Sequence, residues 1–373
     1  MSGETDDELE RIATEVVAAH AAEVDGGAFP TRSIEALAEA GLLGLLSAVV
    51  VGGAGQGPRA AARVVERLAR ECGSTAMVVC MHYAGVPVLE RFAELDVRSA
   101  VAAGRQLSTL AFSEAGSRSQ FWAPVSSAVR VNGGVALSAR KSFITSASHA
   151  ALYVWSSRPL AAEGICTLWL VPASADGLRV AAKFDGLGLR GNDSAPVTAE
   201  GVRIPEANRL GPDGGGLPLM LEVIMPLFNV MSAAQCVGLM EAATARTAAH
   251  AAGVRFEHTA SALAELPTVR AYLARMRIKT DMARTLLEDT LAAMEQGRAD
   301  TGLRVLECKA AAGESATEVL DLAMRICGGA AFRKEVGVER MFRDARASTV
   351  MAPTTDALYD FIGKAMCGMD LFG

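Results

Sequence analysis

Apolar residues recur at the spacing of an α-helix through the first hundred residues of the chain. In the opening segment they share one helical face, at Leu9, Ile12, Ala13, Val16 and Val17. Pro30 interrupts this pattern, and Thr31 can cap the helix that follows. The helices predicted in this way cover residues 5–24, 31–42, 60–72 and 74–92. We therefore expect an N-terminal helical domain over residues 1–106.

The pattern changes after Gln106. Short runs rich in β-branched and aromatic residues alternate with turn residues such as Asn132-Gly133-Gly134. These strand-like runs lie at residues 107–112, 125–131, 136–144, 153–155, 167–171 and 197–202. The sequence therefore predicts a small β-domain over residues 107–211.

Helical periodicity returns after Gly211, and its segments are longer than before. They cover residues 217–249, 267–296, 301–328 and 353–366. Helices of this length bury their apolar faces against one another in a bundle. We expect a C-terminal four-helix bundle over residues 212–373, so the fold class is α+β with several domains.

Composition excludes some classes of protein. The net charge is −6 and no block of lysines and arginines is present, which argues against a nucleic-acid partner. The apolar stretch 42–51 is too short to span a membrane. The seven cysteines form no Cys-x-x-Cys pair and sit mostly in apolar runs, as buried free thiols do. We expect a cytoplasmic protein with no metal site and no membrane partner.

Three segments can carry chemistry. The loop Phe112–Gln120 offers hydroxyls and backbone N–H groups that can meet a ring carbonyl or a phosphate. Lys141-Ser-Phe-Ile-Thr-Ser146 follows at the end of a predicted strand. Gly328-Gly329 ends an apolar helix and lets a cofactor or another chain approach the backbone closely.

These segments, in this order, resemble the motifs of the acyl-CoA dehydrogenase family. The resemblance also includes 186–194, 201–211 and Met351-Ala352-Pro353-Thr354, and it runs from about Phe29 to Ile362. It implies an N-terminal helical domain, a middle β-barrel-like domain and a C-terminal four-helix bundle. It also implies a homotetramer or homodimer, in which the C-terminal segment of one subunit completes its neighbour's cofactor site.

The resemblance implies FAD as the cofactor, in preference to FMN, because Gly328, Gly329 and Thr354 are retained. In the family, the aromatic residue at Phe143 packs on the flavin, and the threonine hydroxyl at Thr145 faces it. Arg255 takes the place of an arginine that reaches the cofactor diphosphate. The cofactor-binding residues implied in this way are Ser113, Gly116, Ser119, Phe143, Thr145, Arg255, Gly328, Gly329, Thr354 and Asp356.

The usual catalytic base has no counterpart here. The two positions that hold a glutamate in family members align with Ala352 and Phe228, and neither side chain can accept a proton. Three explanations remain open. The first is a carboxylate from elsewhere in the chain, with Asp356, Glu222 and Asp193 nearest in sequence. The second is decarboxylation of the substrate in place of proton abstraction. The third is that the chain is one of the flavin monooxygenases with this fold.

His82 is a candidate catalytic residue for the monooxygenase alternative. It lies on an apolar helix beside Tyr83, and the family uses this helix to line the acyl pocket. A histidine there can hydrogen-bond a substrate oxygen near neutral pH. It can equally be a core histidine whose ring nitrogens are both hydrogen-bonded, and the sequence leaves both possibilities open.

The function that the resemblance implies first is FAD-dependent oxidation of an acyl thioester, carried on CoA or on a carrier protein, or of a related carbonyl substrate. The alternative is flavin-dependent monooxygenation, with decarboxylation or desaturation of the substrate in specialised metabolism. A third hypothesis is a catalytically inactive structural homologue. Retention of Phe143, Thr145 and the glycine pair argues against the third.

Overall fold

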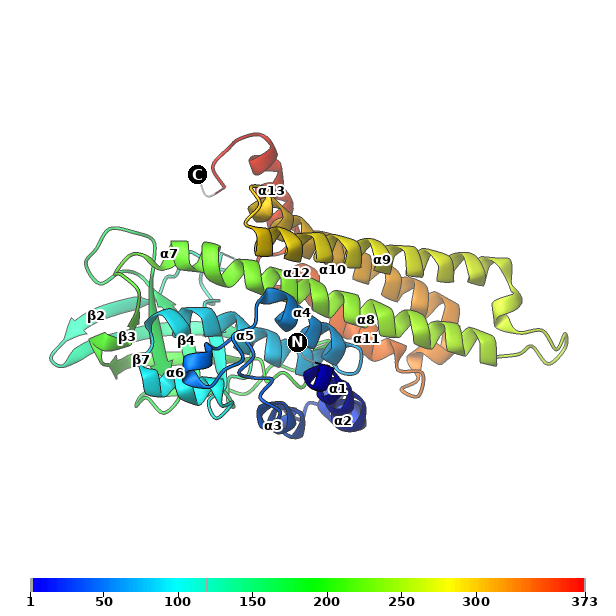
Figure 1. Ribbon diagram of the computed structural model, residues 1–373, viewed down its shortest axis with the longest axis horizontal. Coiled ribbons are helices and arrows are strands. Elements are labelled where there is room, and N and C mark those ends of the chain that lie inside the picture. The colour runs from blue at the N-terminus through cyan, green and yellow to red at the C-terminus, as the bar shows by residue number, and fades with distance from the viewer. Residues whose placement is uncertain (1–2, 119, 372–373) are drawn as a thin grey trace. The chain divides into compact units, whose positions relative to one another are not determined.

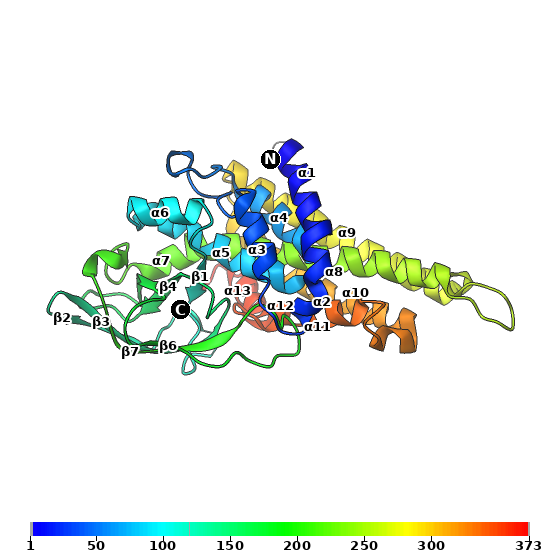
Figure 2. The same ribbon diagram turned by 90° about the horizontal axis from the view of Figure 1, so that it is seen from below.

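The computed structural model describes residues 3–118 and 120–371 of the chain (Figures 1 and 2). The chain divides into two compact units. The first unit comprises Met1–Ala61, Met77–Gly186 and Arg190–Phe228, and the second comprises Ala62–Ala76, Leu187–Leu189 and Asn229–Gly373. The predicted domain division at 1–106, 107–211 and 212–373 stays a prediction, because these units do not test its boundaries.

The N-terminal helices follow the predicted pattern, apart from one short helix that was not predicted. They are α1 (Gly3–Arg11), η1 (Ile12–Val17), α2 (Ala18–Asp25), α3 (Thr31–Glu39), α5 (Gly73–Phe92) and the unpredicted α6 (Leu95–Ala102). The first three form one continuous helix, because η1 is a single π-helical insertion between α-helical segments. Ile12 and Leu37 are fully buried, and α2 and α3 lie side by side in both ribbon views.

The β-domain consists of two four-stranded sheets in the first unit. One has the order β1-β4-β5-β8 and the other β2-β3-β7-β6. The strands are β1 (Ser108–Ala111), β2 (Ser127–Val131), β3 (Gly134–Ile144), β4 (Leu152–Ser157), β5 (Thr167–Pro172), β6 (Leu178–Val180), β7 (Ala195–Ile204) and β8 (Arg209–Leu210). The short strands β6 and β8 were not predicted, since neither is long enough to show a period.

One hydrophobic core joins the two sheets. Trp155 and Trp169 face each other across β4 and β5, and both are fully buried with Val135 and Leu137 of β3. Along β3 the burial alternates between neighbouring residues over most of the strand, as a half-buried strand requires. Buried residues of both sheets therefore hold the strands, and the loops that follow them, in place.

The helical bundle begins at α4 (Pro58–Ala69) and continues through the C-terminal half. Its other helices are α8 (Met225–Gly253), which follows α7 (Gly216–Leu219) and η4 (Met220–Ile224), then α9 (Pro267–Gln296), α10 (Thr301–Cys327), α11 (Val338–Ala345), α12 (Ala347–Val350) and α13 (Thr355–Met366). The four long predicted helices are confirmed. The helical stretch Gly216–Gly253 is apolar and long enough to cross a membrane, but 89% of its most apolar window is buried in the protein, as in a core helix.

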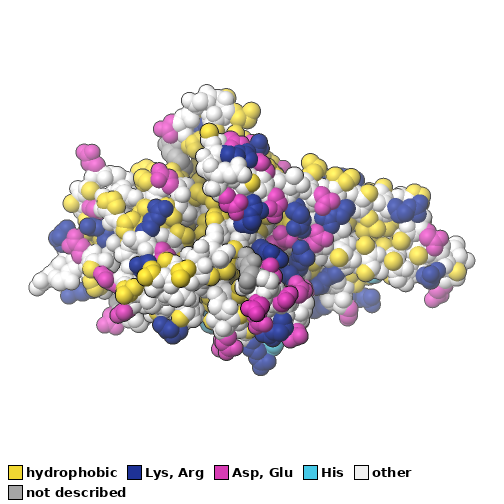
Figure 3. All heavy atoms as spheres, viewed as in Figure 1, with side chains coloured by type: hydrophobic (Ala, Val, Ile, Leu, Met, Phe, Trp, Pro, Cys, Tyr) yellow, Lys and Arg dark blue, Asp and Glu magenta, His cyan; other side chains and the backbone are white. Residues whose placement is uncertain are grey.

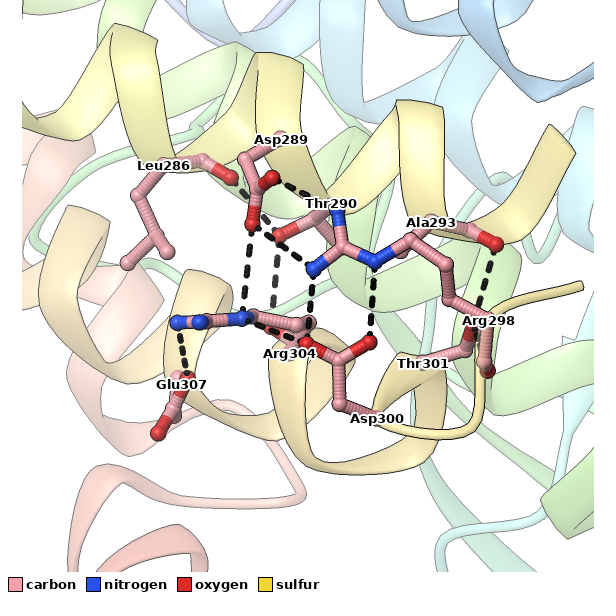
Figure 4. Close-up of polar contacts among 9 residues, drawn as sticks. All are labelled: Leu286, Asp289, Thr290, Ala293, Arg298, Asp300, Thr301, Arg304 and Glu307. Atoms are coloured by element: carbon pink, nitrogen blue, oxygen red, sulfur yellow. Dashed lines mark hydrogen bonds and ion pairs between the residues drawn. The ribbon is translucent and has the colours of Figure 1, made fainter. Parts of the chain in front are cut away.

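A charged cluster fixes the turn between α9 and α10 (Figure 4). Arg298 donates to Asp289 at 2.7 Å and to Asp300 at 2.6 Å. The Thr301 hydroxyl donates to the Ala293 carbonyl at 3.0 Å, which ties the first residue of α10 to the last turn of α9. Gly297, with φ of 62°, makes the reversal that ends α9.

Candidate functional site

Two of the predicted motif segments lie next to each other in the first unit. The loop after β1 pairs with the end of β3 through backbone hydrogen bonds. Ser142 N–H donates to the Ser113 carbonyl at 2.9 Å, and Ala115 N–H donates to the Arg140 carbonyl at 3.2 Å. Segments that lie some thirty residues apart in the sequence therefore form one continuous surface.

A buried ion pair holds these two segments together. The Lys141 ammonium lies 2.6 Å from a Glu114 carboxylate oxygen, and the side chains are 0% and 1% exposed. Lys141 also donates to the Ser156 carbonyl at 2.7 Å. The Glu114 carboxylate accepts from the Ser126 hydroxyl at 2.6 Å and from two backbone N–H groups. Every charge of the pair is therefore matched inside the protein.

The pKa values of this pair follow from burial and mutual attraction. Burial lowers the pKa of Lys141 to about 8, and the adjacent carboxylate opposes this effect. Burial by itself raises the pKa of Glu114, but attraction to the Lys141 ammonium and the hydrogen bonds lower it overall. At neutral pH we therefore treat both groups as charged.

The residues after Lys141 have unusual backbone conformations. Phe143 has φ of 54° and Ser146 has φ of 57°, a region that bulky side chains rarely adopt. Phe143 is 67% exposed even though it is a large apolar residue at the end of a strand. Strained residues persist only where the surrounding structure holds them, and they cluster at functional sites.

Hydroxyl groups next to these residues lack partners. Ser117 Oγ and Ser146 Oγ are buried, and neither has a hydrogen-bond partner among the described residues. The Thr145 carbonyl accepts from the Thr109 hydroxyl at 2.8 Å. Buried hydroxyls without partners cost free energy, and these two lie one on each of the motif segments that the backbone hydrogen bonds join. Gly116 is exposed in the same loop, and Ser119 lies outside the described residues.

The glycine pair of the second unit follows the end of α10. Gly328 has φ of 55° and ψ of −136°, a conformation restricted to glycine. A Cβ atom built at Gly328 or Gly329 would meet no described atom within 4 Å. The described chain therefore leaves room for a side chain at Gly329. Its backbone is open to another molecule.

The segment that contains Ala352 is also fixed inside the second unit. The buried Lys309 ammonium donates to the carbonyls of Ser348, Met351 and Pro353, at 3.2, 3.0 and 2.7 Å. Ala352 is half-buried between these contacts. Thr354 caps α13, because its hydroxyl accepts from Ala357 N–H at 3.3 Å.

Arg255 and Asp356 have different surroundings from the residues above. The Arg255 guanidinium donates to the Ala260 carbonyl at 2.9 Å, within its own loop after α8. Asp356 is exposed in the first turn of α13. Their assignment to the cofactor stays a prediction that rests on the resemblance.

His82 is fully buried, and both of its ring nitrogens have partners. Nε2 lies 3.1 Å from the Leu43 carbonyl, and Nδ1 accepts from Ser108 N–H at 3.1 Å. This arrangement places the proton on Nε2. The geometry favours the core histidine over the catalytic one, because neither nitrogen is available to a substrate.

Lowering the pH is expected to destabilise the protein through His82. Burial lowers the pKa of His82 from 6.5 to about 4. Between these values the unfolded chain binds a proton that the folded protein does not, so the free energy of unfolding falls as the pH falls. The full effect is about 3 kcal/mol. Urea unfolding of the wild type and of His82→Gln at several pH values measures it.

The His82→Gln variant should be less stable than the wild type at pH 7 and less sensitive to pH between about 6.5 and 4. Its turnover should be close to normal in the molecules that stay folded. A variant of wild-type stability that loses roughly a hundredfold or more in turnover would instead restore the catalytic assignment.

Models of three acyl-CoA dehydrogenase domains match the chain in order. The N-terminal domain matches residues 4–103, the middle domain 109–202 and the C-terminal domain 214–367. The chain belongs to the acyl-CoA dehydrogenase family. Members of this family are FAD-dependent oxidoreductases, so the predicted fold, enzyme class and cofactor are confirmed at the level of the family.

Relatives from this family match over nearly the whole chain. A probable acyl-CoA dehydrogenase of Bacillus subtilis, YngJ, is 27% identical over 92% of this chain and 92% of its own. Butyryl-CoA dehydrogenase from Megasphaera elsdenii superposes with a TM-score of 0.90, at 20% identity, over 98% of this chain and 99% of its own. PigA with FAD and proline gives 0.88, at 20% identity, over 100% and 99%.

The residues of the first unit fit a flavin ring, because Phe143 provides an exposed aromatic face and Ser117 and Ser146 provide hydroxyls without partners. In the second unit, the glycine pair leaves backbone that is open to a ligand. Among the described residues no group of three or more His, Cys, Asp or Glu side chains is placed to hold a metal ion.

The three candidate carboxylates differ in their surroundings. Asp193 is buried, accepts from Ser148 N–H at 2.6 Å and contacts His149 at 3.0 Å. Its carboxylate therefore anchors the loop between β3 and β4. Glu222 and Asp356 are exposed, and Glu222 lies in the π-helical turn η4, a feature that is frequent at functional sites.

Sequence reasoning missed two parts of this site. The motifs included Glu114 and Lys141, but the ion pair between them was not predicted. The sequence signal for this pair was an acidic residue in one motif and a lysine in the next. The anchoring role of Lys309 was also missed. A lysine within an apolar stretch of α10 was the signal, since lysine is rarely buried without partners.

Proposed function

We propose that this protein uses FAD to oxidise an acyl thioester, or a related carbonyl compound, carried on CoA or on a carrier protein. The observation that supports this most is the surface formed by the two motif segments of the first unit. There Phe143 is exposed in a strained conformation, and Ser117 and Ser146 of the same two segments carry buried hydroxyls without partners. A flavin ring explains all of these features together.

FAD, when bound, accepts the two electrons that leave the substrate. The chain contributes binding and orientation. In the first unit, the hydroxyls of Ser117, Thr145 and Ser146 supply donors for polar ring atoms, and Phe143 supplies an apolar face. The resemblance to the family also assigns the open backbone at Gly328 and Gly329 to the cofactor. The ion pair of Lys141 and Glu114 fixes the distance between the two loops of the first unit.

Proton removal distinguishes this chain from the dehydrogenases it resembles. Under the resemblance, Ala352 and Phe228 occupy both usual positions of the base, and neither can take a proton. Of the remaining carboxylates, Asp193 is engaged by Ser148 and His149 of the loop between β3 and β4. We infer that an exposed carboxylate, Glu222 or Asp356, acts as the base if the reaction is a dehydrogenation.

A second candidate function is flavin-dependent monooxygenation, with or without loss of a substrate carboxylate. The apolar residues at Ala352 and Phe228 favour it, because such a reaction needs no base for an α-proton. PigA, which shares the fold, has been solved with FAD and proline, so this architecture is not restricted to CoA thioesters.

We further propose that the protein assembles as a homotetramer or homodimer through its bundle. Large apolar side chains are exposed on the second unit, including Ile278 (57%), Met282 (61%) and Phe332 (83%). Hydrophobic side chains gather over α8 and α9 in Figure 3. Exposed apolar surface of this kind marks interaction sites, and the open glycine pair lies on the same unit.

The test starts from the purified protein. Heat-released cofactor should be FAD by chromatography; a colourless protein with no bound flavin would support the inactive homologue instead. Acyl-CoA and acyl-carrier thioesters are then added without oxygen, and the flavin absorbance is followed. Bleaching supports dehydrogenation. No bleaching, together with substrate-dependent oxygen consumption and an oxygenated product, supports the second candidate.

A further inference from the structure

A second aromatic residue accompanies Phe143. The ring of Phe184 stacks on the ring of Phe143, with centroids 4.4 Å apart and an interplanar angle of 26°. Phe184 lies on the loop between β6 and β7 and is itself 36% exposed. The resemblance to the family includes Phe143 but assigns nothing to Phe184.

Both rings stand on fixed backbone. Phe184 N–H donates to the Ser194 carbonyl at 2.9 Å, immediately before β7. The residue before Phe143 is held by the Ser113 carbonyl, and Lys141 is held by Glu114. The stack therefore forms between two anchored segments of the same unit and does not depend on a mobile loop.

The position of the pair is unusual for core packing. Phe143 keeps 67% of its surface exposed although one neighbour already stacks on it, and its φ of 54° carries a conformational cost. If the ring served only the core, a relaxed backbone and a buried ring would be more stable. Phe143 is thus strained and exposed, and with Phe184 on one face its other face is free for a third flat partner.

We propose that Phe184 is a positioning residue for the flavin and acts through Phe143. The inference rests on the proposed function, since it assumes that the flavin ring packs on Phe143. Phe184 limits the rotation of the Phe143 ring, so that its free face is already oriented when the cofactor binds. Preorganisation of this kind reduces the entropy that binding must overcome.

The test measures FAD binding to full-length holoprotein. The dissociation constant is obtained by dilution, from the fluorescence of released FAD, for the wild type, Phe143→Leu, Phe184→Leu and the double variant. Leucine keeps the apolar character but removes the flat ring. Phe184→Leu should weaken binding by roughly 2- to 10-fold, as expected for one aromatic pair. It should also change the visible absorption bands of the bound flavin.

The double variant should bind FAD no more weakly than Phe143→Leu, because Phe184 acts only through Phe143. Phe92→Leu is a matched control, since Phe92 is 38% exposed in the same unit and lies outside the motif segments; its dissociation constant should equal that of the wild type. Near-ultraviolet circular dichroism checks that each variant keeps its fold.

Three results would overturn the inference. The first is an unchanged dissociation constant and spectrum in Phe184→Leu. The second is independent, additive losses in the double variant. The third is tighter binding in Phe184→Leu, which would mean that Phe184 occupies space that the cofactor needs. Failure of the proposed function gives a different result from these three. In that case the wild type itself binds no FAD, or its flavin is not reduced by any substrate.

Discussion

Replacing Lys141 with methionine is expected to lower the free energy of unfolding by about 3–5 kcal/mol. In this variant the Glu114 carboxylate stays buried but has lost its cation, since the Glu114 side chain is only 1% exposed. The hydrogen bonds from Ser126 and two backbone N–H groups remain, but they do not replace a full positive charge. Urea unfolding followed by circular dichroism measures the loss.

Two variants serve as controls for this prediction. Lys141→Met combined with Glu114→Gln removes both charges and should recover much of the lost stability, because no uncompensated charge remains. Arg130→Met breaks an exposed pair with Glu206, at 2.8 Å in the same unit, and should cost about 1 kcal/mol or less. A Lys141→Met loss as small as that of Arg130→Met would show that the buried pair does not hold the loops.

Loss of Lys141 should also weaken flavin binding in the molecules that remain folded. Ser113 and Ser117 lie on one of the two segments that the pair joins, and Phe143 and Thr145 lie on the other. Binding by groups on separate segments depends on their spacing. Fluorescence of released FAD, measured at a temperature where the variant is folded, reports this effect separately from stability.

Introducing a glutamate at Ala352 is expected to raise the rate of substrate-dependent flavin reduction by roughly 10²- to 10⁴-fold, the usual contribution of a general base. The reason is that Ala352 occupies a usual base position of the family and is half-buried. The surrounding backbone is held by Lys309 through the Met351 and Pro353 carbonyls, so the new side chain starts from a fixed position.

Ala352→Gln is the matched control, because glutamine has the size of glutamate but cannot accept the proton. A panel of acyl-CoAs is mixed anaerobically with each variant, and flavin bleaching is followed. Equal rates for Ala352→Glu and Ala352→Gln would show that the pocket itself has diverged from the dehydrogenases. Rapid bleaching of the wild type by simple acyl-CoAs would show that the protein already has an effective base.

The helices and the longer strands could be predicted from the sequence. Apolar residues of the helices repeat at helical spacing over many residues, and the longer strands are runs rich in β-branched and aromatic residues that turn residues separate. The short strands β6 and β8 could not be predicted, because two or three residues carry no period and pair only when a neighbouring strand is present. The sequence motifs likewise predicted Phe143, Thr145 and the glycine pair as site residues, and their roles stay predictions.

What the sequence determined by itself was the family, the order of helices and strands, and the absence of a proton acceptor at residues 352 and 228. These properties reside in residue identity and spacing along the chain. Only the tertiary structure decided that His82 is enclosed by the Leu43 carbonyl and Ser108, that Lys141 pairs with Glu114, and that Phe184 stacks on Phe143. Each of these depends on residues 26 to 41 positions apart meeting in space, and burial then sets the charge state and availability of the groups involved.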